Sequence, residues 1–234
     1  MKILSDWRRC HDGLDLNIKE DWARKYLLAV CGLTVLLALV VSGIDPYDRP
    51  TWFLEVSPVV IGLPVLLSTY RRFPLTSLLY VLISLHALVL ILGGAYTYAH
   101  VPLGFWMQDL FDLHRNPYDK IGHFMQGFVP ALIAREIFVR GGYVSGMRMA
   151  AFLCICVAMA ISAGYELIEW GVALALGKGA DEFLGLQGNP WDTQSDMFMA
   201  LVGAVTALLT LTHFHDRQLE KLDASISRKD THGI

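Results

Sequence analysis

The chain has 234 residues, of which 54% are hydrophobic and 18% charged, and its formal net charge is −3. Soluble domains carry about 25% charged residues, so this composition argues against a soluble enzyme or binding module. The nearly balanced charge gives no basis for a nucleic-acid partner, and none is expected. The apolar residues form long blocks, each close to the roughly 20 residues that cross a bilayer.

These blocks predict an all-α fold, a polytopic membrane bundle of about six transmembrane helices. The predicted spans are 26–44, 52–70, 75–96, 119–138, 149–175 and 193–213. The first is expected to remain as an uncleaved span, because a long segment of mixed charge precedes it and no small-residue cleavage site follows. We therefore divide the chain into an N-terminal cytoplasmic segment (1–25), a transmembrane domain (26–213) and a cytoplasmic tail (214–234).

A polar and aromatic loop separates the third predicted span from the fourth. It begins with "GFWMQDLFDL" at Gly104, and its large apolar side chains suit the surface of a bilayer. We expect Phe105, Trp106, Leu110 and Phe111 to lie on the membrane and to roof any pocket beneath them.

The distribution of Lys and Arg predicts the orientation. With the N-terminus in the cytoplasm, fifteen of the nineteen Lys and Arg residues fall on the inner side. The outer side keeps only Arg49, Arg115, Lys120 and Lys178. Because short cytoplasmic loops are enriched in Lys and Arg, this bias predicts that both termini are cytoplasmic.

With that orientation, ionisable side chains gather in the outer halves of several spans. Six of them form pairs at helical spacing: Asp119 with His123, Glu166 with Glu169, and Asp192 with Asp196. Residues three or four apart share one helix face, so each pair can point the same way. Lys120 and Gln126 accompany the first pair, and Glu55 lies one turn inside the second span.

The two glutamates are the least easily explained of these residues. A carboxylate inside a span costs about 2.5–3.5 kcal/mol on insertion scales and marks a functional site by default. Two carboxylates on one helical turn also repel unless a cation or a shared proton compensates them. Carboxylates with one imidazole suit Mg, Mn, Ca or Zn, so a divalent metal ion is a candidate cofactor. The candidate ligands are His123, Glu166, Glu169 and Asp196.

Simpler roles remain open for several residues. Asp196 three residues after Thr193 resembles a capping box, and Lys120 could extend to the lipid head groups. His123 could be an interfacial histidine bonded to one carboxylate. At the inner end of the fourth span, a local ion pair and the membrane orientation explain Arg135, Glu136 and Arg140.

Three segments carry a resemblance to a known family. "RNPYDKIGHFMQGFVPALIARE", "YELIEW" and "WDTQSDMFMALVGA" resemble the YjdF family of small bacterial inner-membrane proteins, over the second to sixth spans. That family has no assigned activity, so the resemblance implies a multi-pass place in the bacterial inner membrane and a helical fold.

A weaker resemblance is to VanZ-like membrane proteins, which are associated with glycopeptide-antibiotic resistance. Asp119, Lys120, His123 and Phe124 approximate their D-K-x-x-H-F pattern, and either glutamate of the fifth span could match their next acid. Asp196 and Gly203 fit the last motif, but Ala200 stands where that motif has Asn, which puts any transfer of function in doubt.

Three functions are compatible with an outward-facing polar and acidic pocket. It could bind a metal ion, or a lipid or glycan head group of the cell envelope, without catalysis. It could belong to a metal-assisted hydrolase or transferase acting on envelope lipids, with His123 or a glutamate as general base. It could also be part of a small ion- or proton-coupled transporter. Because no established metalloenzyme motif and no inverted repeat is found, the sequence leaves open whether the protein is an enzyme.

Overall fold

The computed structural model describes residues 2–176 and 190–232, and within them every regular element is a helix. The helices are α1 (Lys2–Ser42), α2 (Arg49–Thr69), α3 (Ser77–Ala95), α4 (Pro102–Phe111), α5 (Tyr118–Gly141), α6 (Met147–Leu176) and α8 (Asp192–His232). The predicted all-α membrane bundle is therefore confirmed.

Five of the described helices are long and apolar enough to cross a membrane, and they cover five of the six predicted spans. The sixth predicted span, 119–138, corresponds to α5, which is 24 residues long but is not among those five. Its polar side chains are largely buried, Gln126 and Glu136 among them. A helix shielded from lipid by its neighbours can carry such residues, because they need not face hydrocarbon.

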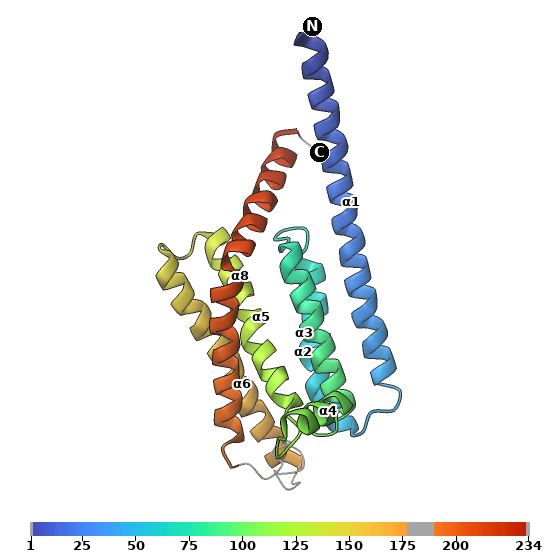
Figure 1. The fold of residues 1–234 in the computed structure, drawn as a ribbon, viewed down its shortest axis with the longest axis vertical. Coiled ribbons are helices and arrows are strands. Elements are labelled where there is room, and N and C mark those ends of the chain that lie inside the picture. Colours follow the sequence, from blue (N-terminus) through green and yellow to red (C-terminus); the bar gives the residue numbers. More distant parts are fainter. Residues whose placement is uncertain (1, 177–189, 233–234) are drawn as a thin grey trace.

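The helix α5 lies at the centre of the bundle. It packs against α3, α6 and α8, while α1 and α2 pack on α3 (Figure 1). The two long helices α1 and α8 extend beyond the rest of the bundle at the end where the two termini lie (Figure 1). The short helix α4 lies at the opposite end, between α3 and α5 in the chain.

Two glycines allow α5 and α8 to approach closely. A Cβ added to Gly127 would lie 1.7 Å from the Ala200 carbonyl oxygen, and one added to Gly203 would lie 2.0 Å from the carbonyl oxygen of Phe124. Small residues at such crossings let backbones touch, which is a common way for membrane helices to associate. This contact fixes the distance between the two helices that carry most of the site.

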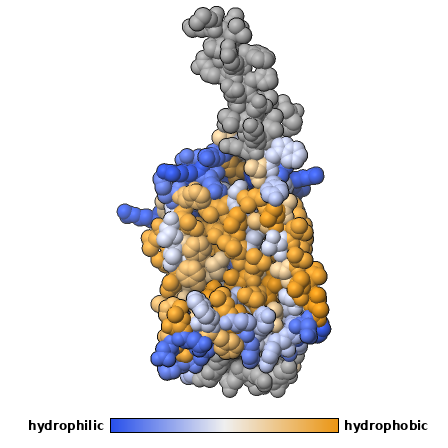
Figure 2. Space-filling view, turned by 45° about the vertical axis from the view of Figure 1, so that its right-hand side comes forward, coloured by the Kyte–Doolittle hydropathy of each residue, from blue (hydrophilic) through white to orange (hydrophobic). Residues whose placement is uncertain are grey.

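The surface agrees with a membrane location. Figure 2 shows an apolar belt around the middle of the visible face, with hydrophilic residues gathered toward the ends. The helix α4 adds exposed apolar side chains at one end, where Trp106 is 61% and Phe111 is 62% exposed. Such side chains suit a helix that lies along the membrane surface.

Helix ends differ more from the sequence prediction than helix positions do. The helix α1 begins at Lys2 and α8 continues to His232, so both run well past the predicted spans. Helix α2 begins at Arg49, three residues before the predicted span, because Asp48 caps it: the Asp48 carboxylate accepts a hydrogen bond from the Thr51 amide (2.9 Å). The cytoplasmic assignment of 1–25 and 214–234 stays a prediction.

Candidate functional site

A polar pocket lies at the α4 end of the bundle. It has a volume of about 90 Å³ and is lined by α2, α5, α6, α8 and the turn before α4. Six of the candidate residues line it: Asp119, His123, Glu166, Glu169, Asp192 and Asp196. The other two, Lys120 and Gln126, bond to lining residues from outside. The structure therefore brings all eight candidates together.

Three of these residues converge on one point. Single ligand atoms from Asp119, His123 and Asp196 all lie within 4.8 Å of one another. The His123 Nε2 atom is 3.4 Å from Asp119 Oδ1 and 3.8 Å from Asp196 Oδ2. Two ligands of one ion, each about 2.2 Å from it, lie at most about 4.4 Å apart. Both distances from His123 Nε2, to Asp119 and to Asp196, are thus short enough for the atoms to share one ion.

The other nitrogen of His123 faces a side-chain amide. Its Nδ1 atom lies 3.2 Å from Gln126 Oε1, one turn further along α5. If Nδ1 carries the proton and donates it to this oxygen, Nε2 is left to bind an ion. Metal-binding histidines typically have such a partner on the second ring nitrogen, which fixes the ring orientation. Both side chains are buried.

Basic residues hold the start of α8 in place. The Lys120 ammonium contacts Asp196 and lies 2.9 Å from Asp192 Oδ1, which also accepts from Arg115 (2.5 Å). Lys120 therefore makes ion pairs within the protein, so reaching toward head groups does not account for its position. Asp192 is 2% exposed and twice paired, so its clearest role is to tie α8 to α5 and the loop before it.

The two glutamates of α6 reach the pocket from the opposite wall. Glu166 is 9% exposed, and its Oε1 atom lies 3.8 Å from His123 Nδ1 without a hydrogen-bond partner among the described residues. Glu169, one turn away, lines the same pocket. Ala158 and Ser162, small residues on the same face of α6 as Glu166, are fully inaccessible. A buried acceptor without a donor is costly, so this oxygen is poised for a bound cation or proton.

Two tyrosine hydroxyl groups beside Glu55, those of Tyr165 and Tyr98, were not predicted from the sequence. The Tyr165 hydroxyl lies 3.2 Å from Glu55 Oε2, which joins α6 to α2. Tyr98, in the turn after α3, lies beside Glu55 as well. Burial, and secondarily the Glu55 carboxylate, raises the pKa of the Tyr98 phenol well above its usual range, so the hydroxyl remains a hydrogen-bond donor. The signal available in the sequence was Glu55, a lone acid one turn inside the second span.

The predicted roof over the pocket is wrong. Phe105, Trp106, Leu110 and Phe111 do not line it; each is between 45% and 62% exposed. Thr97, Tyr98 and Trp170 lie there instead. The cause is that the segment folds into the helix α4, whose apolar residues point away from the bundle.

The site has more acids than bases. Six carboxyl groups line the pocket: Glu55, Asp119, Glu166, Glu169, Asp192 and Asp196. Among the described residues, two permanently charged bases contact this set, Lys120 and Arg115, with His123 as a third potential cation. Six minus two leaves four carboxyl groups, or three if His123 is protonated. In a region of low dielectric, that excess requires bound cations or protons.

A second buried cluster lies at the opposite end of α5 and was missed. The Glu136 carboxylate, fully buried, accepts from Thr76 Oγ1 (2.8 Å) and Arg140 Nη1 (3.0 Å) and lies 2.9 Å from His215 Nε2. A local ion pair alone therefore does not describe Glu136. Arg135 bonds to Asp216 and lies 3.1 Å from His215 Nδ1.

The geometry of this inner cluster assigns its histidine. Arginine only donates, so the Nδ1 atom of His215 accepts from Arg135 and its Nε2–H donates to Glu136. The cluster ties α3, α5 and α8 together, because Glu136 of α5 bonds to Thr76 at the start of α3 and to His215 of α8. It was missed because His215 lies beyond the predicted end of the last span.

The chain resembles known membrane proteins over most of its length. A family model described as "Predicted membrane protein (DUF2238)" matches residues 27–217. The chain is also 60% identical over 195 residues to the inner membrane protein YjdF of Escherichia coli (strain K12), which covers 83% of this chain and 93% of that protein. No solved structure matches the chain.

Proposed function

This chain belongs to the DUF2238 family of predicted membrane proteins and is a multi-pass protein of the inner membrane, and we propose that it binds a divalent metal ion in its polar pocket. The supporting observation is the convergence of Asp119, His123 and Asp196 within 4.8 Å. Lys and Arg predominate at the other end of the bundle, so the pocket faces outward in this proposal.

The chemistry of the donors supports a metal ion. Two carboxylates and one imidazole are ligands for Mn, Zn or Mg. Glu166 would become a ligand of the same ion only if its side chain turned from the Nδ1 side of the imidazole, where it lies, toward Nε2. The excess of four or three unbalanced carboxyl groups supplies the electrostatic driving force. Residues Lys120 and Gln126 would then orient Asp196 and His123 rather than bind the ion.

The size of the pocket favours an ion over an organic ligand. Pockets for small organic molecules have volumes of about 300–1,000 Å³, whereas this one has about 90 Å³. An ion with a few water molecules fits, since each water occupies about 30 Å³ of liquid. A lipid or glycan head group does not fit inside the pocket bounded by the described residues. For the same reason, metal-assisted hydrolysis of envelope lipids gains no support from the geometry.

Ion- or proton-coupled transport remains a second candidate because of the inner cluster. The buried Glu136 and His215 place ionisable groups in the other half of α5 and α8, where the sequence had suggested only a local ion pair for Glu136. Between the two clusters, the backbones of α5 and α8 touch at Gly127 and Gly203, which leaves no passage along that interface. Transport would require these helices to separate.

A titration of thermal stability with metal ions tests the binding proposal. The full-length protein in detergent is stripped with a chelator and mixed with Mg²⁺, Ca²⁺, Mn²⁺ or Zn²⁺ in turn. At 100 times the Kd, a ligand that binds only the folded state stabilises it by about 2.7 kcal/mol, so at least one ion should raise the melting temperature.

Two histidine variants complete the design. The His123→Ala variant should lose the response to metal ions. The His114→Ala variant removes an exposed histidine between α4 and α5 and should keep that response. An equal response of His123→Ala and the unaltered protein to the same ion would exclude His123 as a ligand. The absence of a response to all four ions would contradict the proposal.

A further inference from the structure

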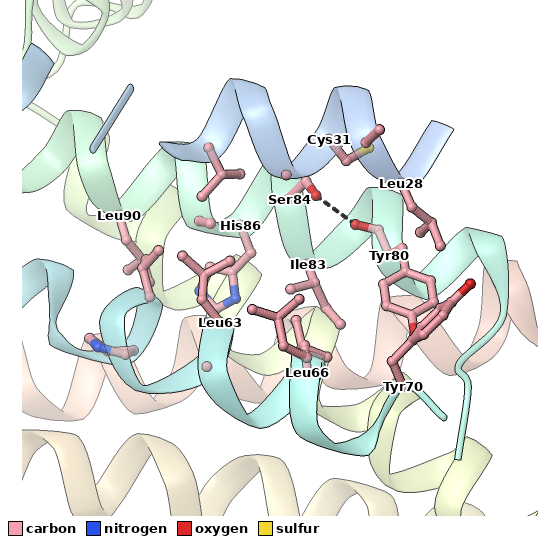
Figure 3. Close-up of a pocket in the computed structure, with 18 of the residues that line it drawn as sticks. Leu28, Cys31, Leu63, Leu66, Tyr70, Tyr80, Ile83, Ser84, His86 and Leu90 are labelled. Atoms are coloured by element: carbon pink, nitrogen blue, oxygen red, sulfur yellow. Dashed lines mark hydrogen bonds between the residues drawn. The ribbon is translucent and has the colours of Figure 1, made fainter. Parts of the chain in front are cut away.

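A large apolar groove lies on the other side of the bundle, away from the polar pocket. It has a volume of about 410 Å³ and is lined by α1, α2 and α3. Figure 3 shows Leu63 and Leu66 of α2 and Ile83 and Leu90 of α3 extending into the space beside α1. The Ser84 hydroxyl does not offer a polar contact there, because it donates to Tyr80 O of its own helix (2.8 Å).

The groove exists because α1 and α2 meet at one end only. Near the α4 end, Trp52 Nε1 donates to Ser42 Oγ (3.0 Å), and Val35 of α1 belongs to the same buried cluster as Val56 and Val59 of α2. Toward the other end the groove is lined by Gly32 and Gly62, and an added Cβ at either would have nothing within 4 Å. The space between the two helices is therefore unfilled by protein side chains.

The length of the groove matches one leaflet of a bilayer. Along α1 it runs from Lys25 to Val35, ten residues or about 15 Å at 1.5 Å per residue. The hydrocarbon core of a bilayer is about 30 Å thick, so the groove covers about half of it. An acyl chain entering at the Lys25 end would reach about the middle of the membrane.

Cationic and aromatic residues surround the open end. Lys25 and Tyr70 line it, and Arg71 and Arg72 follow Tyr70 directly at the exposed turn after α2. Trp22 lies one turn before Tyr26, and Trp22 is 69% exposed, as expected for a residue at the membrane interface. Three basic residues at the level of the head groups attract anionic lipids, because each such charge near a membrane surface contributes about 1 kcal/mol.

We propose that this groove binds one acyl chain of an anionic phospholipid from the cytoplasmic leaflet, with its phosphate held near Lys25, Arg71 and Arg72. The bilayer supplies such a lipid to any open apolar groove, and the charge at the mouth selects among head groups. This site is distinct from the metal pocket, with which it shares no lining residue.

Native mass spectrometry of the full-length protein tests the proposal. The protein, released from detergent, is titrated with phosphatidylglycerol and, separately, with phosphatidylcholine of identical acyl chains. We expect one tightly bound phosphatidylglycerol, with phosphatidylcholine bound at least fivefold more weakly, which is the effect of a single cation. Replacing Lys25 and Arg72 together by Gln should reduce that preference several-fold.

Two filling variants locate the site. A Cβ added at Gly32 or Gly62 meets nothing within 4 Å, so Gly32→Leu and Gly62→Leu extend a side chain into the groove from an unobstructed position. Both also replace Gly by a better helix former, so folding should be preserved. Both should abolish the bound lipid. Gly171→Leu, also without neighbours within 4 Å but on α6, is the matched control and should bind lipid normally.

Three results would overturn the inference. The first is equal binding of the two lipids, and the second is an undiminished amount of bound lipid in both filling variants. The third is a lipid-free dimer that Gly62→Leu disrupts, because a second copy of the chain would then occupy the groove. A normal response of Gly62→Leu to metal ions is also expected, since α2 reaches the pocket at Glu55, two turns from Gly62.

Discussion

The contact between α5 and α8 makes a quantitative prediction for Gly203→Ala. The new Cβ would lie 2.0 Å from the Phe124 carbonyl oxygen, whereas ordinary contacts begin at 3.4 Å. The helices must therefore separate by about 1.4 Å at this point, the difference between these two distances. Because the obstacle is a backbone atom and cannot rotate away, we expect Gly203→Ala to lower the free energy of unfolding by about 3 kcal/mol, the upper end of the range for overpacking.

The same displacement should weaken the site. Asp119 and His123 lie on α5, and Asp196 lies on α8 two turns before Gly203. A separation of 1.4 Å is about two thirds of a metal–ligand bond of about 2.1 Å, so one ion could no longer touch all three. Gly203→Ala should lose the stabilisation by metal ions as well as intrinsic stability.

Thermal unfolding in detergent, with and without the ion, measures both effects. At about 2–4 °C per kcal/mol for a chain of this size, Gly203→Ala should melt roughly 6–12 °C lower. Gly32→Ala is the control, because its Cβ meets nothing within 4 Å, and it should be neutral or slightly stabilising. If Gly203→Ala melts like the control and responds to metal normally, the close contact does not hold the site together.

Three further predictions use other parts of the structure. Glu166→Gln should accumulate in the membrane and resist heat better than Glu166→Lys, because Gln keeps the size of Glu, whereas the longer Lys side chain overfills a pocket of about 90 Å³ and costs about 1–3 kcal/mol. Equal tolerance would show that Glu166 faces water or head groups. Glu136→Ala should destabilise the protein in detergent by about 3–5 kcal/mol, because it breaks a buried ion pair. Asp216→Ala should cost about 1 kcal/mol or less, because Asp216 is 40% exposed. The reverse order would contradict the assigned inner cluster. Reporter fusions should read as external after Leu110 and as cytoplasmic after Arg72, and an external signal at Arg72 would invert the proposed orientation.

The positions of the helices could be predicted from the sequence, but their ends could not. Hydropathy marks the residues that face hydrocarbon, and α8 continues from there to His232 as a polar helix. Its extension includes Leu219 and Leu222, which are buried (5% and 6% exposed). Contacts of that kind depend on neighbouring helices, so a window of apolar residues does not detect where such a helix stops.

The outer polar cluster could be predicted from the sequence, whereas the inner one could not. Asp119 and His123 share a face of α5, and this spacing together with a common leaflet was enough to predict that they meet acids from α6 and α8. Glu136 and His215 are 79 residues apart in the chain and meet only because α5 and α8 cross. Nothing local in the sequence encodes that pairing.

The choice of ligands was also only partly predictable. Helical spacing placed Glu169 beside Glu166, but the three atoms that converge belong to Asp119, His123 and Asp196. Which member of a pair reaches inward depends on the rotation of each helix, and this is set by contacts such as that of Gly127 with Ala200. The involvement of Glu166 and Glu169 in metal binding stays a prediction.

Elemental analysis of the gently purified, full-length protein tests the central claim most directly. The measurement is the molar ratio of each divalent metal to protein, after dialysis without a chelator, for the unaltered chain and for His123→Ala. We predict about one ion per chain in the unaltered protein and a large loss in His123→Ala, with His114→Ala unchanged, because His123 lies beside Asp119 and Asp196 whereas His114 is exposed. A metal content near zero in the unaltered protein, or one that His123→Ala retains in full, would contradict the account.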